Sequence, residues 1–130
     1  MYNAFAEDEH HFLCSAAVDY VALDEIANRK YNNPGPTPPE EEFVRALDFI
    51  AYLFKKYGKH LKCLEGPDMH QRTESLEELI RWLKGQFDTG KYTEIHYGIW
   101  FELDKTVIPP EYIPIDTVEK DIDAIKNGLK

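Results

Sequence analysis

Apolar residues recur every three or four positions in four stretches of the chain, the spacing that places them on one face of a helix. These stretches cover residues 7–31, 38–57, 75–88 and 116–129. The second stretch is the most apolar, so we expect its helix to be the most buried. The sequence therefore predicts four helices, with a proline-rich connector at residues 32–39 between the first and the second.

Capping signals mark where two of these helices begin. Thr37 and Glu40 have the spacing of a capping box, and Pro38 suits the first helical position. Ser75 and Glu78 repeat the capping-box spacing at the third stretch. We therefore expect the second helix to begin at Pro38 and the third to begin directly after Ser75.

Residues 92–103 instead alternate between apolar and polar positions, which is typical of a half-buried strand. We expect this strand to lie at the centre of a small sheet. A second strand at residues 106–108 and an edge strand at residues 60–64 complete the sheet, and the prolines within residues 109–114 favour an extended loop. The apolar face of the central strand carries Ile95, Tyr97, Ile99, Phe101 and Leu103, and its polar face carries Glu94, His96, Gly98, Trp100 and Glu102.

Together these patterns predict one α+β domain over residues 1–130, with the connector at residues 32–39 inside it. Helices dominate: about four of them pack on a small, mainly antiparallel sheet. Hydrophobic residues make up 43% of the chain, which is enough for a packed core and argues against disorder.

Charge narrows the choice of partners. The chain carries 24 acidic and 15 basic residues, a net charge of −9. Such a field attracts basic surfaces and repels phosphates over about 8–10 Å at ordinary salt. We therefore expect a protein partner with a basic surface and no nucleic-acid partner.

The N-terminus lacks the basic region of a secretory signal, and no apolar run approaches the roughly 18 residues of a membrane helix. These features predict a cytoplasmic protein without a membrane partner.

No catalytic motif accompanies this charge. The chain has no nucleophile elbow, phosphate-binding loop, dinucleotide-binding fingerprint, zinc-protease motif, EF-hand loop or Cys-x-x-Cys pair. Acidic clusters at residues 7–9 and 40–42 lie at predicted helix starts, where the helix dipole favours negative charge. No motif identifies a family, and no cofactor is expected.

Two cysteines carry the remaining candidate chemistry. Cys14 follows His11, and Cys63 follows His60, each at a separation of three positions. Imidazole and thiolate are good zinc ligands, and a cysteine beside a histidine can act as a nucleophile. The simplest interpretation is two reduced, mostly buried thiols, and a disulfide between them is an alternative. A small metal-binding protein or enzyme built on Cys14, Cys63 and the histidines is the main alternative function.

The polar face of the predicted strand is the candidate binding site. There Trp100 stands among Glu94, His96 and Glu102, and an exposed tryptophan ringed by charge is typical of an interface anchor. The sequence thus predicts a non-catalytic, acidic protein-binding module. Its narrower form is an inhibitor, immunity or antitoxin-like protein that masks a basic site on its partner. Two alternatives remain for Trp100: burial in the core, and burial against a second copy in a homo-oligomer.

Overall fold

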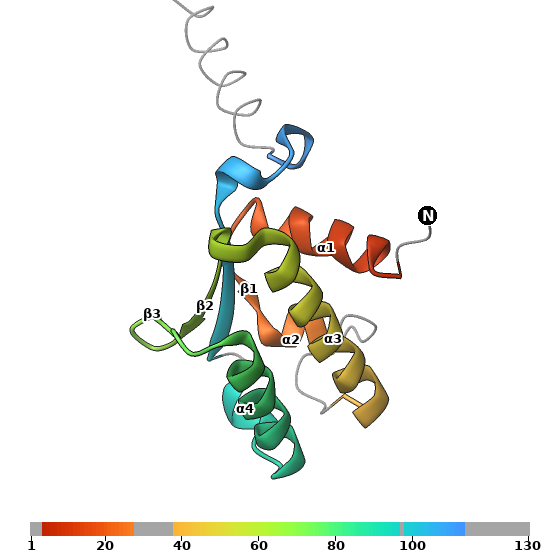
Figure 1. The fold of residues 1–130 in the computed structure, drawn as a ribbon, viewed down its shortest axis with the longest axis vertical. Helices are drawn as coiled ribbons and strands as arrows, with labels where there is room; N and C mark the ends of the chain where they lie inside the picture. Colours follow the sequence, from red (N-terminus) through yellow and green to blue (C-terminus); the bar gives the residue numbers. More distant parts are fainter. Residues whose placement is uncertain (1–3, 28–37, 97, 114–130) are drawn as a thin grey trace, which may run out of the picture.

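The computed structural model describes residues 4–27, 38–96 and 98–113 (Figure 1). In this part of the chain, five α-helices and a four-stranded antiparallel sheet confirm the predicted helix-dominated α+β class. The predicted helix at residues 116–129, the cap at Thr37 and most of the connector lie outside the described residues. None of the described helices has the length and apolar character that a membrane span requires. The elements are α1 (Ala6–Ala16), β1 (Val21–Ala22), α2 (Leu23–Ala27), α3 (Glu40–Tyr57), β2 (Leu61–Glu65), β3 (His70–Gln71), α4 (Leu76–Asp88), α5 (Tyr92–Ile95) and β4 (Ile99–Leu103), with short 3₁₀ helices at Gly58–His60, Lys105–Val107 and Pro110–Tyr112.

β4 is an interior strand of the sheet, whose order is β1-β4-β2-β3. Phe101 pairs with Val21 of β1 on one side and with Cys63 of β2 on the other. The predicted central position is therefore confirmed for residues 99–103. β2 has β4 and β3 on its two sides, so the prediction that residues 60–64 form an edge strand is wrong.

The predicted long helix at residues 7–31 is also wrong, because the chain leaves α1 after Ala16 and then forms β1. Valine, aspartate and tyrosine, which follow at residues 18–20, each cost roughly a few tenths of a kcal/mol more than alanine in a helix. The Asp19 carboxylate instead accepts the Tyr20 N–H at 2.8 Å, and the next two residues pair with β4. Strand pairing thus outweighs a weak helical preference.

Residues 92–96 and 98 do not continue β4, which corrects the predicted strand at residues 92–103. The predicted inward position of Tyr97 lies outside the described residues. Tyr92 begins the short helix α5, and its ring is 1% exposed. It packs edge-on against Phe43 of α3 and Phe87 of α4, with centroids 5.7 and 6.3 Å away. His96, four residues on, stacks on the same ring. Burial of Tyr92 against α3 and α4 therefore overrides the local alternation of apolar and polar residues.

The predicted cap of α4 is confirmed, whereas the predictions of one helix start, one strand and one loop are corrected. The Ser75 hydroxyl accepts the Glu78 N–H at 3.2 Å. α3 begins at Glu40, so Pro38 precedes the helix rather than opening it. Residues 106–108 form no strand, because the Asp104 carboxylate accepts the N–H of residue 106 at 3.0 Å and starts a 3₁₀ turn. Another 3₁₀ turn, Pro110–Tyr112, interrupts the predicted extended loop.

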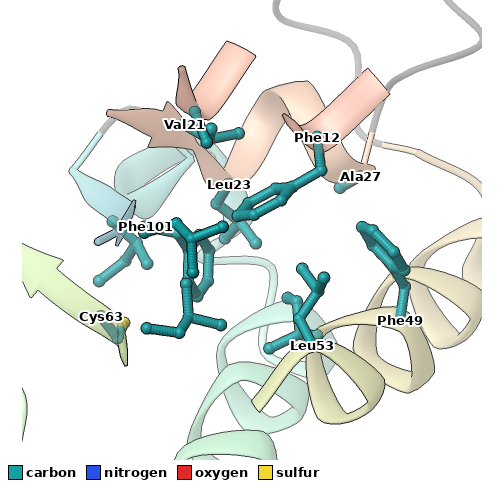
Figure 2. Packing of buried hydrophobic residues seen from close by; sticks show 14 of the residues in the cluster. Phe12, Val21, Leu23, Ala27, Phe49, Leu53, Cys63 and Phe101 are labelled. Carbon is teal, nitrogen blue, oxygen red and sulfur yellow. The ribbon is translucent and has the colours of Figure 1, made fainter. Parts of the chain in front are cut away.

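Helices α1, α2 and α3 lie over one face of the sheet, and α4 packs against α3 near one end of it (Figure 1). The odd-numbered side chains of β4 point to this face, and Phe101 has no exposed surface. Figure 2 shows Phe101 and Cys63 of the sheet grouped with Phe12 of α1 and Leu53 of α3. Each fully buried side chain of this kind contributes about 1.5–3 kcal/mol through removal from water. The inner face of the sheet therefore forms one side of the hydrophobic core, and the helices form the other.

One buried ionic cluster fastens α1 to α3. Glu9 is 6% exposed, and its carboxylate accepts hydrogen bonds from the Tyr52 hydroxyl and from Lys56 Nζ, both at 2.6 Å. The Tyr57 hydroxyl is a third donor. Burial alone raises the pKa of Glu9, but the hydrogen bonds from Lys56, Tyr52 and Tyr57 outweigh it and hold the pKa below its usual value.

Glu9→Gln should lower the free energy of unfolding by about 2 kcal/mol near neutral pH, because charge-assisted hydrogen bonds are lost. The folded pKa of Glu9 lies below the unfolded value, so this stabilisation is complete above the unfolded pKa and is lost as the pH falls through the folded pKa. Urea unfolding at successively lower pH should show the two proteins converging in acid.

Glu7→Gln is the matched control, since Glu7 is an exposed carboxylate in the same first helical turn. It should change the free energy of unfolding by less than about 0.5 kcal/mol. Equal losses for the two variants would contradict a stabilising role for the Glu9 cluster.

Candidate functional site

No described helix packs against the outer face of the sheet (Figure 1). On this face Trp100 lies between its two cross-strand partners, Ala22 of β1 and Leu64 of β2. Directly opposed side chains of antiparallel strands stand roughly 5 Å apart, so the large indole shields both neighbours. Ala22 and Leu64 are 2% and 7% exposed, whereas Trp100 remains partly exposed. Trp100 is therefore the outermost apolar group at the centre of this face.

An open groove of about 680 Å³ borders Trp100, and we call it the Trp100 groove. The β2–β3 turn forms part of it: a Cβ atom placed on Gly66 would lie 3.8 Å from the indole Nε1. The Gly66 N–H donates to the Gly98 carbonyl at 2.9 Å, which fastens this turn to the residue before β4. The rest comes from the α1–β1 connection, from α5 and from the residues after it. The lining residues are Asp19, Tyr20, Gly66, Pro67, Met69, Thr93, Glu94, His96, Gly98 and Trp100.

Three of the four predicted site residues line this groove, namely Glu94, His96 and Trp100. They do not share one strand face as predicted, because Glu94 belongs to α5 and His96 follows it. Glu94 is exposed, whereas His96 is 8% exposed. Glu102 lies two residues further along β4 than Trp100 and lines a neighbouring groove. The predicted set is thus divided between two adjoining hollows.

Buried contacts hold His96 in place. Its ring stacks on Tyr92, with centroids 5.3 Å apart, and its main-chain carbonyl accepts the Asp24 N–H at 3.2 Å. The Tyr92 hydroxyl in turn donates to Asp24 Oδ1 at 2.9 Å, a buried hydrogen bond between α5 and α2. Breaking such a bond leaves a buried polar group unsatisfied at a cost of about 1–3 kcal/mol. The groove is therefore preformed where His96 contributes to it.

The neighbouring groove, of about 450 Å³, carries charges of both signs. Lys62 and Glu102 are direct cross-strand partners in it. His60 Nδ1 lies 3.5 Å from Asp104 Oδ2. Because opposite charges face each other here, they offset one another, and this groove presents less net charge to a partner than its charged residues suggest. Its ionisable lining residues are Lys59, His60, Lys62, Lys105, Asp19, Glu102 and Asp104.

In the part of the chain that the structure describes, Cys14 and Cys63 do not gather with the histidines into one cluster, although Cys14 lies beside His10. Cys63 is 2% exposed, and burial raises its pKa to about 12. Cys14 is exposed on α1, where His10 Nε2 lies 3.9 Å from its sulfur. Both are free thiols, and the prediction of mostly buried thiols is correct only for Cys63. Within residues 4–27, 38–96 and 98–113, no three potential metal ligands form a group.

Sequence patterns missed Asp19, Tyr20 and Met69, which line the Trp100 groove. The helical spacing assigns Tyr20 to an inward stripe, yet its side chain is 39% exposed. A weak signal was present, because valine and tyrosine around Asp19 favour strands over helices. Met69 lies in the β2–β3 turn and adopts a left-handed backbone conformation, with φ of 57°. Gly66 and Pro67 predict this turn, but they do not indicate on which face of the sheet the Met69 side chain lies.

Comparison with known proteins gives no match: no family model, no curated protein and no solved structure is similar to this chain. The Trp100 groove offers aromatic and thioether surface beside carboxylates, and no serine or cysteine occurs among its described lining residues. A concave surface with apolar rings and a few polar groups is typical of a ligand site, catalytic or not.

Iodoacetamide at about pH 8 should alkylate Cys14 in the folded protein and spare Cys63, because only a thiolate reacts and the burial of Cys63 suppresses that form. Peptide mass spectrometry should detect Cys63 modification only after unfolding in urea. Similar rates for both thiols in the folded protein would contradict the core position of Cys63 and would favour the catalytic alternative.

Proposed function

We propose that this chain is a non-catalytic protein-binding module whose partner docks on the outer face of the sheet, over the Trp100 groove. The observation that carries the proposal is a partly exposed tryptophan at the centre of a face that no described helix covers. Tyr20 and Glu94 border it and are exposed. Interfaces draw most of their affinity from a few aromatic or arginine anchors surrounded by a polar rim.

Charge supports a partner with a basic surface. The chain has a net charge of −9, and Asp19 and Glu94 lie at the groove. Charge of this sign speeds the encounter with a basic protein, and the local carboxylates set its orientation. An inhibitor, immunity or antitoxin-like protein that masks a basic site is the narrower form of the proposal. It rests on the small size, the acidic charge and the absence of catalytic motifs.

A second apolar groove, of about 520 Å³, lies between α3 and α4 and serves as a comparison surface. Val44 lines it and is 39% exposed, the same fraction as Tyr20. Arg81 and Lys84 stand beside acidic residues there, so this groove has no field of a single sign. The Trp100 groove is therefore the better candidate for an electrostatically guided partner.

A photo-crosslinking amino acid at Thr93, an exposed lining residue, should capture a partner from extracts of the producing cells. The same probe at Val44 should not. Trp100→Ala should lower the Thr93 adduct about tenfold or more, as expected for an anchor residue. Raising the salt from about 0.05 to about 0.5 M should lower it further, because the charges are screened. Mass spectrometry quantifies each adduct.

Val44→Ala is the control for Trp100→Ala and should leave the Thr93 adduct unchanged. The proposal is wrong if Thr93 yields no adduct, if the adduct survives Trp100→Ala, or if only the Val44 probe captures a partner. An adduct that contains two copies of this chain would instead support the homo-oligomer.

A further inference from the structure

The Trp100 groove combines two kinds of surface that together specify the charge of a ligand. Trp100 and Tyr20 supply aromatic rings, and Asp19 and Glu94 supply carboxylates. Among the described lining residues there is no lysine or arginine. Neither carboxylate forms an ion pair with any residue in the described part of the chain. The groove therefore presents negative charge beside exposed indole surface.

A cation gains from both kinds of surface. The face of an indole or phenol ring attracts a cation within about 6 Å of the ring centre. Carboxylates add charge-assisted hydrogen bonds, which are shorter and stronger than neutral ones. An anion would be repelled by Asp19 and Glu94, and a neutral apolar group would strip water from them without replacing their hydrogen bonds. The chemistry of the groove thus favours a positively charged group.

The fold already contains a filled version of such a site. The Arg72 guanidinium lies over the Trp82 ring, 3.8 Å from its centroid. It donates to Glu74 at 2.6 Å and to Glu65 at 2.9 Å. One indole and two carboxylates therefore hold a guanidinium inside this protein. The lining of the Trp100 groove also contains an indole and two carboxylates, and no lysine or arginine occurs among its described residues.

We propose that the Trp100 groove binds an arginine or lysine side chain from a basic segment of the partner, with the cation on the Trp100 ring and paired with Asp19 or Glu94. This inference rests on the proposed docking function. Arginine fits best, because a guanidinium both stacks on an indole and forms bidentate hydrogen bonds with a carboxylate.

The test uses the two indole N–H signals of the ¹⁵N-labelled protein, which come from Trp82 and Trp100 and are assigned with Trp100→Phe. A blocked peptide of arginine–glycine repeats should shift the Trp100 signal and leave the Trp82 signal in place. The matching citrulline peptide has the same shape without the charge, and it should bind about tenfold more weakly or less. A lysine peptide supplies the other cation and should bind more weakly than the arginine peptide.

Variants separate the carboxylates from the global charge. Asp19→Asn and Glu94→Gln should each weaken arginine-peptide binding about threefold to fivefold, the range of an exposed ion pair. Both residues are exposed, so both variants should fold. Glu77→Gln makes the same change in charge on α4, away from the groove, and should leave binding unchanged.

An unmoved Trp100 signal, or equal binding of the arginine and citrulline peptides, would overturn the cation site. If Thr93 crosslinks still form and still require Trp100, the docking function stands and only the chemistry of the ligand is wrong. If the crosslinks also fail, both proposals fall.

Discussion

The pairing of β4 with strands on both sides determines how this molecule is arranged. Successive side chains of a strand point to opposite faces, so the register that buries Phe101 also places Trp100 on the other side. Helices α1, α3 and α4 all contribute to the core on the Phe101 side. The Glu9 cluster and the ion pair between Asp8 and Arg45, at 2.7 Å, fasten α1 to α3. No described helix packs on the Trp100 side, and this is the face on which we propose that a partner docks.

Features with local causes could be predicted from the sequence. α4 begins after Ser75 because a hydrogen bond within four residues caps it, and the alternation of residues 99–103 gives β4 its two faces. Features that depend on distant partners could not. Tyr92 fits an alternating strand, yet it lies in a short helix because its ring packs against Phe43 of α3. Tyr20 fits a helix, yet the residues after it pair with β4. A single sequence contains no signal that weighs these contacts against local preference.

The candidate site likewise contains features with local causes and features that depend on distant partners. The position of Trp100 on the face opposite Phe101 was predictable, because it follows from the alternation of residues 99–103. Glu94 and His96 do lie beside it, although a short helix and not the predicted strand brings them there. Asp19 joins them only because β1 pairs with β4. The acidic residues likewise fall into two groups: the Glu9 carboxylate is ion-paired with Lys56 inside the fold, whereas the Asp19 carboxylate lies exposed at the groove.

The most direct test of this account places the same polar side chain on each face of β4. In urea unfolding, Trp100→Gln should cost about 1–2 kcal/mol, because the amide can reach water on the open face. Phe101→Gln should cost more than about 4 kcal/mol, because it leaves a cavity and buries an amide without partners. A similarly large loss at both positions would show that Trp100 is enclosed, and the outer face could not be a docking surface.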